Sequence, residues 1–395
     1  MALESVRVLD LTQVMAGPFC AQVLADFGAD VVKVEPVSVG DQARRSLGVP
    51  AGVSDSAAFL AVNRNKRSLA ANLKDERGRA VFYRLVDTAD ILLENFRPGV
   101  TARLGIDYPT LRDRNPRLIY GSISGFGQTG PFASWPGYDL MAQAMSGVMS
   151  VTGRPGGTPL KAGVPVGDLS AGLFCALGVL SAYVARDRIG TGQYVDTSLF
   201  EGALALSIWE AAEYWMTGSA PQPLGSRHRL SAPYQAFATR DGYITIGANN
   251  QWLWERLCHA VNRPDLLLDD RFATNAERMA HVDELEQELQ GVLSRRATAE
   301  WLEALIAAGV PAAPIRDYSE VLEDAHTDAR GMVVNVDHPV AGRVKMLGTP
   351  VKLSETPASV RRPAPMLGQH TAEILADAGY TPAEIELLIH DGVVA

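Results

Sequence analysis

The chain has few cysteines, and none lies at a spacing that binds a metal or builds a disulfide framework. Cys20, Cys175 and Cys258 are the three cysteines among 395 residues, and the sequence contains no CxxC pair of the kind found in zinc and redox sites. Two of them lie in apolar, helix-like context, where a thiol packs as a small hydrophobic group. The pattern predicts buried free thiols, no metal site and a reducing, cytoplasmic location.

Positive charge is also in deficit. The 36 Lys and Arg residues are outnumbered by 45 Asp and Glu residues, which gives a formal net charge of -9. General binding to nucleic acid requires a basic face that neutralises phosphates. We therefore expect no nucleic-acid partner, and we expect any phosphate group to be bound at a local site.

The sequence lacks an obvious membrane segment. Residues 1–12 lead directly into a strand pattern, without the charged leader and apolar stretch of a secretory signal. The main uncharged apolar run, residues 169–185, is slightly short for a membrane span and follows an acid. It predicts instead a helix that is buried on nearly every side. No membrane partner is expected.

The first two hundred residues alternate between strand-like and helix-like segments. Helix patterns at 16–29 and 76–89 lie between strand patterns at 6–12, 30–36, 68–73, 90–96 and 118–124. This order predicts an α/β fold with a mostly parallel sheet and helices on its faces. Because 395 residues exceed what one hydrophobic core normally organises, we expect a second domain.

Composition indicates where the domains meet. Residues 1–216 would form the first part of a large domain, and residues 217–233 are rich in Pro, Gly and Ser, as in a linker. A smaller domain is expected at 234–325, followed by a return linker at 326–350. Residues 351–395 are too few for a core of their own, so we expect them to rejoin the large domain.

Residues 125–130, GFGQTG, match the dinucleotide-binding pattern GxGxxG and follow a predicted strand. In that fold a helix begins inside the motif and directs its N-terminus at the pyrophosphate. Pro131 and Pro136 prevent such a helix here. The context therefore argues against an NAD- or FAD-dependent oxidoreductase.

Asp168 stands between a glycine-rich approach and the apolar run at 169–185. An aspartate at a helix start can accept hydrogen bonds from the free backbone N–H groups and complement the helix dipole. N-capping is therefore one interpretation of Asp168. The other is a carboxylate that a ligand can approach, because Gly163, Gly167 and Gly172 leave room.

Eight segments, taken in order, resemble the family III CoA-transferases over essentially the whole chain. They are RVLDLTQVMAGPFCAQVLADFGADVVKVEP, NRNKRSLAANLK, ENFRPGV, LIYGSISGFGQTGP, GYDLMAQAMSG, VGDLSAG, GTGQYVDTSL and LGQHTAEIL. This family, the CaiB/BaiF family, also contains formyl-CoA transferases and alpha-methylacyl-CoA racemases. The resemblance implies a Rossmann-like large domain whose parallel sheet is formed by N- and C-terminal parts, a smaller central α+β domain, and an interlocked homodimer.

The resemblance implies a chemical role for Asp168, the aspartate of the GD motif. In the family's transferases this residue attacks the thioester carbonyl of an acyl-CoA, forms an aspartyl anhydride and then carries CoA as a thioester. CoA and acyl-CoA would be substrates, and no permanently bound cofactor, metal or ATP is expected. A carboxylic acid would be the acceptor.

A loop at residues 247–251 takes the place of the glycine loop that covers the active site in formyl-CoA transferase. By this resemblance Gly247, Asn249 and Gln251 are expected at the catalytic centre, where backbone N–H groups, with the side chains of Asn249, Asn250 or Gln251, could stabilise oxyanions. An ordinary turn after a strand is the alternative.

By the same resemblance, five cations are expected to bind the phosphates of CoA: Lys33, Arg64, Lys66, Arg67 and Arg97. Arg97 is the strongest candidate, because it follows a strand whose C-terminal end should face the ligand crevice. Met15 and Ala16 are also expected beside CoA. Formyl-CoA transferase has a glutamine where this chain has Met15, which argues against formyl transfer to oxalate specifically.

Tyr138 distinguishes two activities of the family. Racemases use the histidine of a GHD motif as a base, and here the motif reads GYD. Tyrosine is a poor base at neutral pH, since its reference pKa is about 10. We therefore expect CoA transfer, with Tyr138 near the thioester, and keep the racemase as the alternative. The acceptor is expected to be a small or dicarboxylic acid, whose distal carboxylate could meet Arg227, His228 or Arg229.

Overall fold

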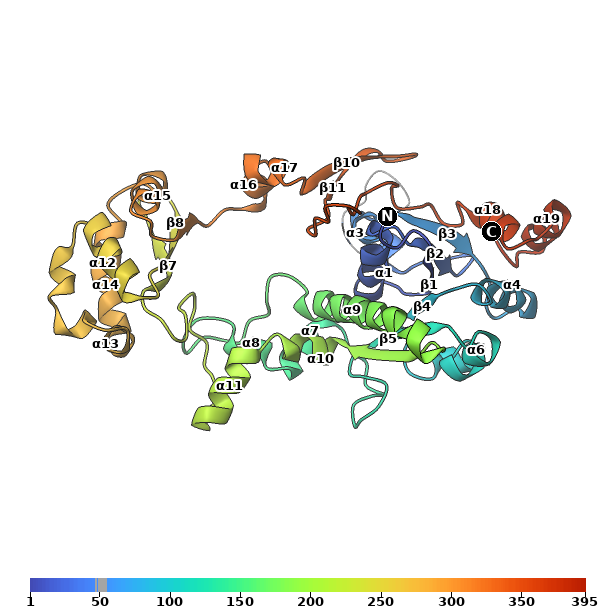
Figure 1. Cartoon of the computed structure of the whole chain (residues 1–395), viewed down its shortest axis with the longest axis horizontal. Helices are drawn as coiled ribbons and strands as arrows, with labels where there is room; N and C mark the ends of the chain where they lie inside the picture. Colours follow the sequence, from blue (N-terminus) through green and yellow to red (C-terminus); the bar gives the residue numbers. More distant parts are fainter. Residues whose placement is uncertain (47, 49–54) are drawn as a thin grey trace. The chain divides into compact units, whose positions relative to one another are not determined.

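The computed structural model describes residues 1–46, 48 and 55–395. The chain divides into two compact units. Figure 1 shows the whole chain, coloured from the N-terminus to the C-terminus. Unit 1 consists of Met1–Met149, Lys161–Gly218 and Ala325–Ala395, and unit 2 consists of Ser150–Leu160 and Ser219–Asp324. Each unit has its own hydrophobic core.

Unit 1 is built on a six-stranded parallel sheet in the order β3-β2-β1-β4-β5-β6. The strands are β1 (Arg7–Asp10), β2 (Asp30–Glu35), β3 (Lys66–Ala70), β4 (Ile91–Glu94), β5 (Ile119–Ser124) and β6 (Tyr194–Ser198). The predicted parallel α/β sheet is confirmed. Strand order reverses between β1 and β4, and in such sheets ligands bind beyond the carboxyl ends of the strands at this point.

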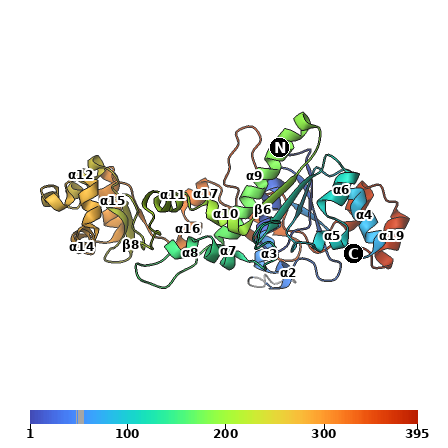
Figure 2. The same ribbon diagram turned by 90° about the horizontal axis from the view of Figure 1, so that it is seen from below.

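Helices cover both faces of the sheet, as Figure 2 shows for α9 on one side and α4, α6 and α19 on the other. The first face carries α1 (Ala16–Asp26) and α9 (Val166–Ile189). The second carries α4 (Glu76–Val86), α6 (Tyr108–Arg114), α18 (Thr371–Asp377) and α19 (Pro382–His390).

The contribution of the C-terminal part differs from the expectation. All six strands come from residues 7–198, so the sheet is not formed by both ends of the chain. The C-terminal part instead supplies α18 and α19, whose Ile374 and Leu388 enter the core of the second face. Its main chain also contacts β3 and the residues after it, through an isolated bridge between Ala71 and Val394 and hydrogen bonds such as that from the Ala395 N–H to the Ala70 carbonyl at 3.1 Å.

The helix predicted at 169–185 is α9, and its burial differs from the prediction. Ala171, Cys175 and Val179 are buried, but Leu177 is 61% exposed and Val184 is 80% exposed. Because the helix is apolar all round, its sequence did not reveal an uncovered face. By length and composition it could also cross a membrane, although a core helix satisfies the same criteria.

Unit 2 contains an antiparallel sheet with helices, in the order β7-β8-β9. Its main elements are β7 (Tyr234–Ala238), β8 (Tyr243–Gly247), β9 (Ala312–Pro314), α12 (Gln251–Ala260), α13 (Asn275–Ala280), α14 (Val282–Leu293) and α15 (Thr298–Ala307). Its core contains the fully buried Trp254 and Phe272.

The remaining elements are short. They are α2 (Ala43–Ser46), α3 (Ala57–Val62), α5 (Val100–Leu104), α7 (Asp139–Met145), α8 (Val148–Val151), α10 (Leu199–Ala205), α11 (Ile208–Thr217), the 3-10 turns Pro264–Leu267 and Asp270–Phe272, α16 (Tyr318–Leu322), α17 (Ala325–Ala329), β10 (Val333–His338) and β11 (Gly342–Leu347). Cys20, Cys175 and Cys258 are all buried free thiols, as predicted.

Candidate active site

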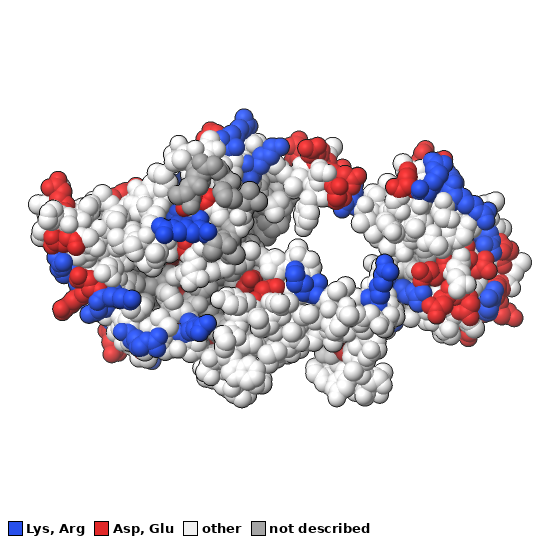
Figure 3. Space-filling model, turned by 180° about the vertical axis from the view of Figure 1, so that it is seen from behind, with Lys and Arg blue, Asp and Glu red and all other residues white. Residues whose placement is uncertain are grey.

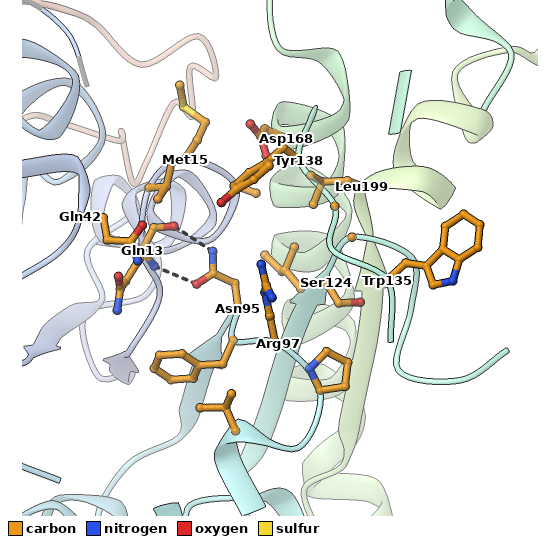
Figure 4. A pocket seen from close by; sticks show the side chains of 18 of the residues that line it. Gln13, Met15, Gln42, Asn95, Arg97, Ser124, Trp135, Tyr138, Asp168 and Leu199 are labelled. Atoms are coloured by element: carbon orange, nitrogen blue, oxygen red, sulfur yellow. Dashed lines mark hydrogen bonds between the residues drawn. The ribbon is translucent and has the colours of Figure 1, made fainter. Parts of the chain in front are cut away.

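A cavity of about 360 Å³ lies in unit 1 where the segments after β1 and β4 meet. Figure 4 shows its main side chains. It is lined by residues 13–16, Gln42, residues 95–98, Val100, residues 123–125, Ala133, Trp135, Gly137, Tyr138, Asp168 and Leu199. The cavity therefore opens where the strand order reverses, which is the position that a parallel sheet offers to a ligand.

Five residues predicted from the sequence line this one cavity: Met15, Ala16, Arg97, Tyr138 and Asp168. They come from four separate segments of the chain. The structure thus brings these candidates together, while their roles in catalysis and CoA binding stay predictions.

Asn95, which the sequence prediction missed, holds two walls of the cavity together. Its Oδ1 accepts a hydrogen bond from the Gln13 N–H at 2.8 Å, and its Nδ2 donates to the Gln13 carbonyl at 2.8 Å (Figure 4). The adjacent Val14 has a φ of 74°, which strains a β-branched residue by about 1–3 kcal/mol. Its N–H donates to Asp41 Oδ1 at 3.0 Å. These contacts hold the strained loop in place.

Asp168 is not the N-cap of α9. The helix begins at Val166 with Pro165 at the cap position, so Asp168 is its third residue. The carboxylate that meets the helix start belongs to Asp139, whose Oδ1 accepts from the N–H groups of Gly167 at 2.8 Å and Asp168 at 3.3 Å. The capping interpretation was therefore wrong for Asp168, because a different aspartate fills that role.

The Asp168 carboxylate consequently has no hydrogen-bond donor among the residues that the structure describes, and it lines the cavity. Burial and, secondly, the negative charge of Asp139 raise the pKa of Asp168 to about 7. A carboxylate in this setting is only partly compensated, and such groups are typical of functional sites.

Arg97 is an exposed cation that points toward the cavity from the segment after β4 (Figure 4). Within the described ranges, its guanidinium has no hydrogen bond or ion pair. It is therefore available to an anionic ligand.

Lys33 and Lys66, by contrast, do not present their charges to a ligand. Both are fully buried in unit 1. The Lys66 ammonium lies 2.8 Å from Asp10 Oδ2, and the Lys33 ammonium lies 2.9 Å from Asp41 Oδ2. This is a correction to the sequence prediction: the two lysines neutralise internal carboxylates, and their burial excludes contact with a CoA phosphate in this conformation.

Arg64 and Arg67 are also engaged by carboxylates. Arg64 pairs with Asp26 at 2.7 Å, and Arg67 pairs with Asp30 at 2.6 Å and also with acids on α18. Both arginines are less than 10% exposed. They tie β3 and the chain before it to neighbouring elements, so they too are corrected from phosphate ligands to structural cations. Asp26 and Asp30 lie 38 and 37 residues before their partners, so no local pattern indicated these pairs.

The loop predicted to supply oxyanion donors belongs to unit 2. Gly247 ends β8, Asn249 is exposed, and Asn250 caps α12 by accepting from the Leu253 N–H at 2.9 Å. Gln251 begins α12, and its Oε1 accepts from Arg278 at 3.1 Å. Asn250 thus fits the alternative of a helix-starting turn, while the catalytic role of the loop stays a prediction.

The other basic candidates also lie in unit 2. Arg227 pairs with Asp283 at 2.6 Å and with Glu286. Arg229 donates to the Gln222 carbonyl at 3.0 Å, and the His228 N–H donates to the Tyr234 carbonyl at 3.0 Å. Binding of a distal carboxylate by these residues stays a prediction.

The GFGQTG segment follows β5 without beginning a helix. Gly127 and Gly130 have φ values of 91° and 89°, and the next helix, α7, begins only at Asp139. No helix N-terminus is therefore formed inside the motif, in agreement with the argument against dinucleotide binding.

Comparison with known proteins identifies the family of this chain. Residues 3–371 match CoA-transferase family III. The chain belongs to this family. It is 43% identical over 378 residues to an acetyl-CoA:oxalate CoA-transferase of Acetobacter aceti, covering 94% of each chain. It is 38% identical over 393 residues to the succinyl-CoA:glutarate CoA-transferase of Mus musculus, covering 99% of this chain and 90% of the relative.

Solved structures agree with this assignment. A CaiB/BaiF family protein from Brucella suis superimposes with a TM-score of 0.85 at 37% identity, covering 94% of this chain and 98% of that one. The expected family is therefore confirmed, and the chain is a family III CoA-transferase.

Proposed function

We propose that this CoA-transferase moves CoA from an acyl-CoA to a small or dicarboxylic acid, with Asp168 as the nucleophile. The observation that carries the proposal is the position of Asp168: its carboxylate lines the cavity at the switch point of the sheet and has no donor among the described residues. The names of similar proteins, which act on oxalate, glutarate and mesaconate, support the class of acceptor.

The proposed reaction exchanges one thioester for another. An Asp168 oxygen attacks the thioester carbonyl, the C–S bond breaks, and a mixed anhydride and CoA thiolate form. The thiolate then attacks the Asp168 carboxyl carbon, releasing the first acid as its carboxylate and leaving an aspartyl-CoA thioester. The acceptor carboxylate attacks that same carbon and expels the thiolate, which finally attacks the new acyl carbonyl and regenerates Asp168.

Several residues have supporting roles in this proposal. Arg97 would bind a phosphate of CoA, since it is the predicted cation that remains open at the cavity. Met15 and Ala16 would contact the CoA arm, and Tyr138 would contact the thioester. Donors from the loop at 247–251 would stabilise the oxyanions of each addition.

We further propose that the protein acts in the cytoplasm as an interlocked homodimer. Unit 1 leaves large apolar side chains uncovered on α9 and α11, including Leu177, Val184, Trp215 and Met216, of which the last two are 79% and 85% exposed. The part of unit 1 that carries α10 and α11 is largely free of charged side chains on the face in Figure 3. Such surface normally marks an interface. Light scattering should give twice the chain mass, and a monomer would reject the dimer.

Racemisation is the second candidate function, and it is disfavoured because Tyr138 occupies the position of the racemase histidine. Deuterium incorporation at the α carbon of an acyl-CoA, without any acceptor acid, would support it. A non-catalytic acyl-CoA-binding protein would bind the ester but form no covalent adduct.

The main test is an exchange assay. The protein is incubated with succinyl-CoA or acetyl-CoA and a panel of acids that includes oxalate, glutarate and citramalate, and new thioesters are identified by mass spectrometry. Peptide mapping of the trapped enzyme should find CoA attached to Asp168. New thioesters with the adduct at another residue would contradict the assignment of the nucleophile.

A further inference from the structure

Asp139 and Asp168 form a pair of acids with divided tasks at the start of α9. Asp139 lies in the first turn of α7, and its Oδ1 accepts from the N–H groups of Gly167 and Asp168. Its other oxygen, Oδ2, accepts from Gln143 Nε2 at 2.6 Å. The fully buried Gln143 in turn accepts from the Ala162 N–H at 2.8 Å through its Oε1. Both oxygens of the Asp139 carboxylate therefore accept hydrogen bonds.

This arrangement matters because the first N–H groups of a helix need acceptors. An aspartate in the first turn can turn back to satisfy them, and its oxygens are then engaged. Here the N–H of Asp168 itself is directed at Asp139 Oδ1. The close fit depends on Gly167, where a Cβ atom would lie 3.1 Å from that oxygen and 3.3 Å from the Ala142 Cβ.

From this geometry we propose that Asp139 is a positioning residue for CoA transfer: by accepting from the N-terminus of α9, it leaves the Asp168 carboxylate free in the cavity to act as the nucleophile. The inference rests on the proposed function. It assigns a task to the aspartate of the GYD motif, for which the sequence alone suggested none.

The charged groups around Asp168 also support different roles for Asp139 and Asp168. Among the described residues, Tyr138 and Arg97 are the other ionisable side chains that line the cavity, and Asp139 lies beside Asp168 at the start of α9, while the α1 and α10 segments contribute Met15, Ala16 and Leu199. After burial, the charge of Asp139 is the second cause that raises the pKa of Asp168 to about 7. Removing this charge should therefore lower the pKa and make Asp168 a weaker nucleophile that is ionised over a wider pH range.

Two variants separate the hydrogen bonds of Asp139 from its charge. Asp139→Ala removes both, so the α9 N–H groups recruit Asp168, and kcat should fall about 100-fold, with KM for acyl-CoA changed less than about threefold. The double variant Asp139→Asn with Gln143→Glu keeps an acceptor toward α9 and an amide–carboxylate contact within α7, but moves the charge one turn away. It should recover most of kcat, while the apparent pKa in the pH profile of kcat/KM falls below that of the wild type.

Trapping the acyl-enzyme with hydroxylamine gives an independent readout, because the yield of the Asp168 hydroxamate should fall with kcat in Asp139→Ala. Wild-type kcat, trapping yield and pH profile in a folded Asp139→Ala protein would overturn the inference. If Asp139→Ala does not fold, Asp139→Leu decides, because it also removes the acceptor toward α9 but keeps the volume of the side chain, and wild-type kcat and trapping yield there overturn the inference. Exchange that survives in Asp168→Asn would instead reject the proposed function itself, so the two failures are distinguishable.

Discussion

Asp10 and Asp168 are two aspartates of unit 1 with opposite surroundings. Asp10 ends β1 and is fully buried, and its oxygens accept from the Thr12 N–H at 2.9 Å, from the Thr12 hydroxyl and from Lys66 Nζ at 2.8 Å. Burial alone would raise the pKa of Asp10, but the charges of Lys66 and Lys33 outweigh it and lower that pKa. Asp168 has no such donors, and its pKa is raised to about 7.

Under the proposed function, one residue type serves the structure at Asp10 and the chemistry at Asp168. A carboxylate whose oxygens are all engaged in a closed interior stabilises the fold and cannot reach a substrate. A carboxylate that is partly desolvated, unpaired and open to a cavity costs folding free energy but can form a covalent bond. Four experiments test this contrast, from the largest expected effect to the smallest.

Removing the acid at Asp168 should have the largest effect on chemistry. Asp168→Asn keeps the size of the side chain but removes the nucleophile, so kcat/KM for CoA exchange should fall about 1000-fold or more. Thermal unfolding should be unchanged or shifted upward. Asp187→Asn, at an exposed ion pair on the same helix, is the matched control and should keep wild-type activity. A reduction of less than about tenfold in Asp168→Asn would place the chemistry elsewhere.

Removing a partner of Asp10 should instead damage the fold. Lys66→Met leaves a buried carboxylate short of its nearest cation, and such a change costs about 3–5 kcal/mol. Urea unfolding monitored by the tryptophan signal and circular dichroism measures this loss. Lys74→Met, at a surface position just after β3, is the control. Stability within about 1 kcal/mol of the wild type would show that Asp10 does not depend on Lys66.

Changing Arg97 tests whether this exposed cation at the cavity contributes to the binding of acyl-CoA, unlike the buried, ion-paired Lys33 and Lys66. Arg97→Gln should raise KM for acyl-CoA about tenfold or more, since a charge-assisted hydrogen bond to phosphate is worth about 1.5–3 kcal/mol. The thermal unfolding temperature should not change. If an acyl donor truncated to the pantetheine arm, which carries no phosphate, shows the same KM increase in this variant, Arg97 does not bind a phosphate of CoA.

Local patterns predicted the framework of unit 1 well. β1, β2, β4 and β5 each lie within a segment predicted from alternating or continuous apolar residues. The position of Arg97 after β4 correctly placed it at the crevice, because the carboxyl ends of parallel strands share one edge. Short-range periodicity and strand order carry this information, so one sequence is sufficient for it.

The contacts that decide individual roles were not predictable in this way. Lys33 and Lys66 looked like available cations because no sequence pattern links them to their acids: Asp41 lies in the irregular segment after β2, and Asp10 lies on β1, 56 residues before Lys66. Asp139 lies 28 residues before Gly167, whose N–H it accepts, so no helix-start pattern could include it. Side-chain pairing across elements depends on three-dimensional packing, which periodicity does not encode.

The smallest expected effect is a pH-dependent change in stability at Asp168. Its pKa is about 7 in the folded state and about 3.9 in an unfolded chain. Between these values the folded state retains a proton that the unfolded state has lost, so this residue reduces stability as pH rises from about 4 to 7. Asp168→Asn cannot titrate. The difference between its unfolding temperature and that of the wild type should therefore increase from about pH 4 to 7 and stay constant at higher pH.

This difference should reach a few degrees, because solvent at the cavity screens the charge. Differential scanning calorimetry at several pH values measures it, with Asp187→Asn as the flat control. A difference between Asp168→Asn and the wild type that does not vary with pH would mean that Asp168, like Asp10, is fully compensated in the fold.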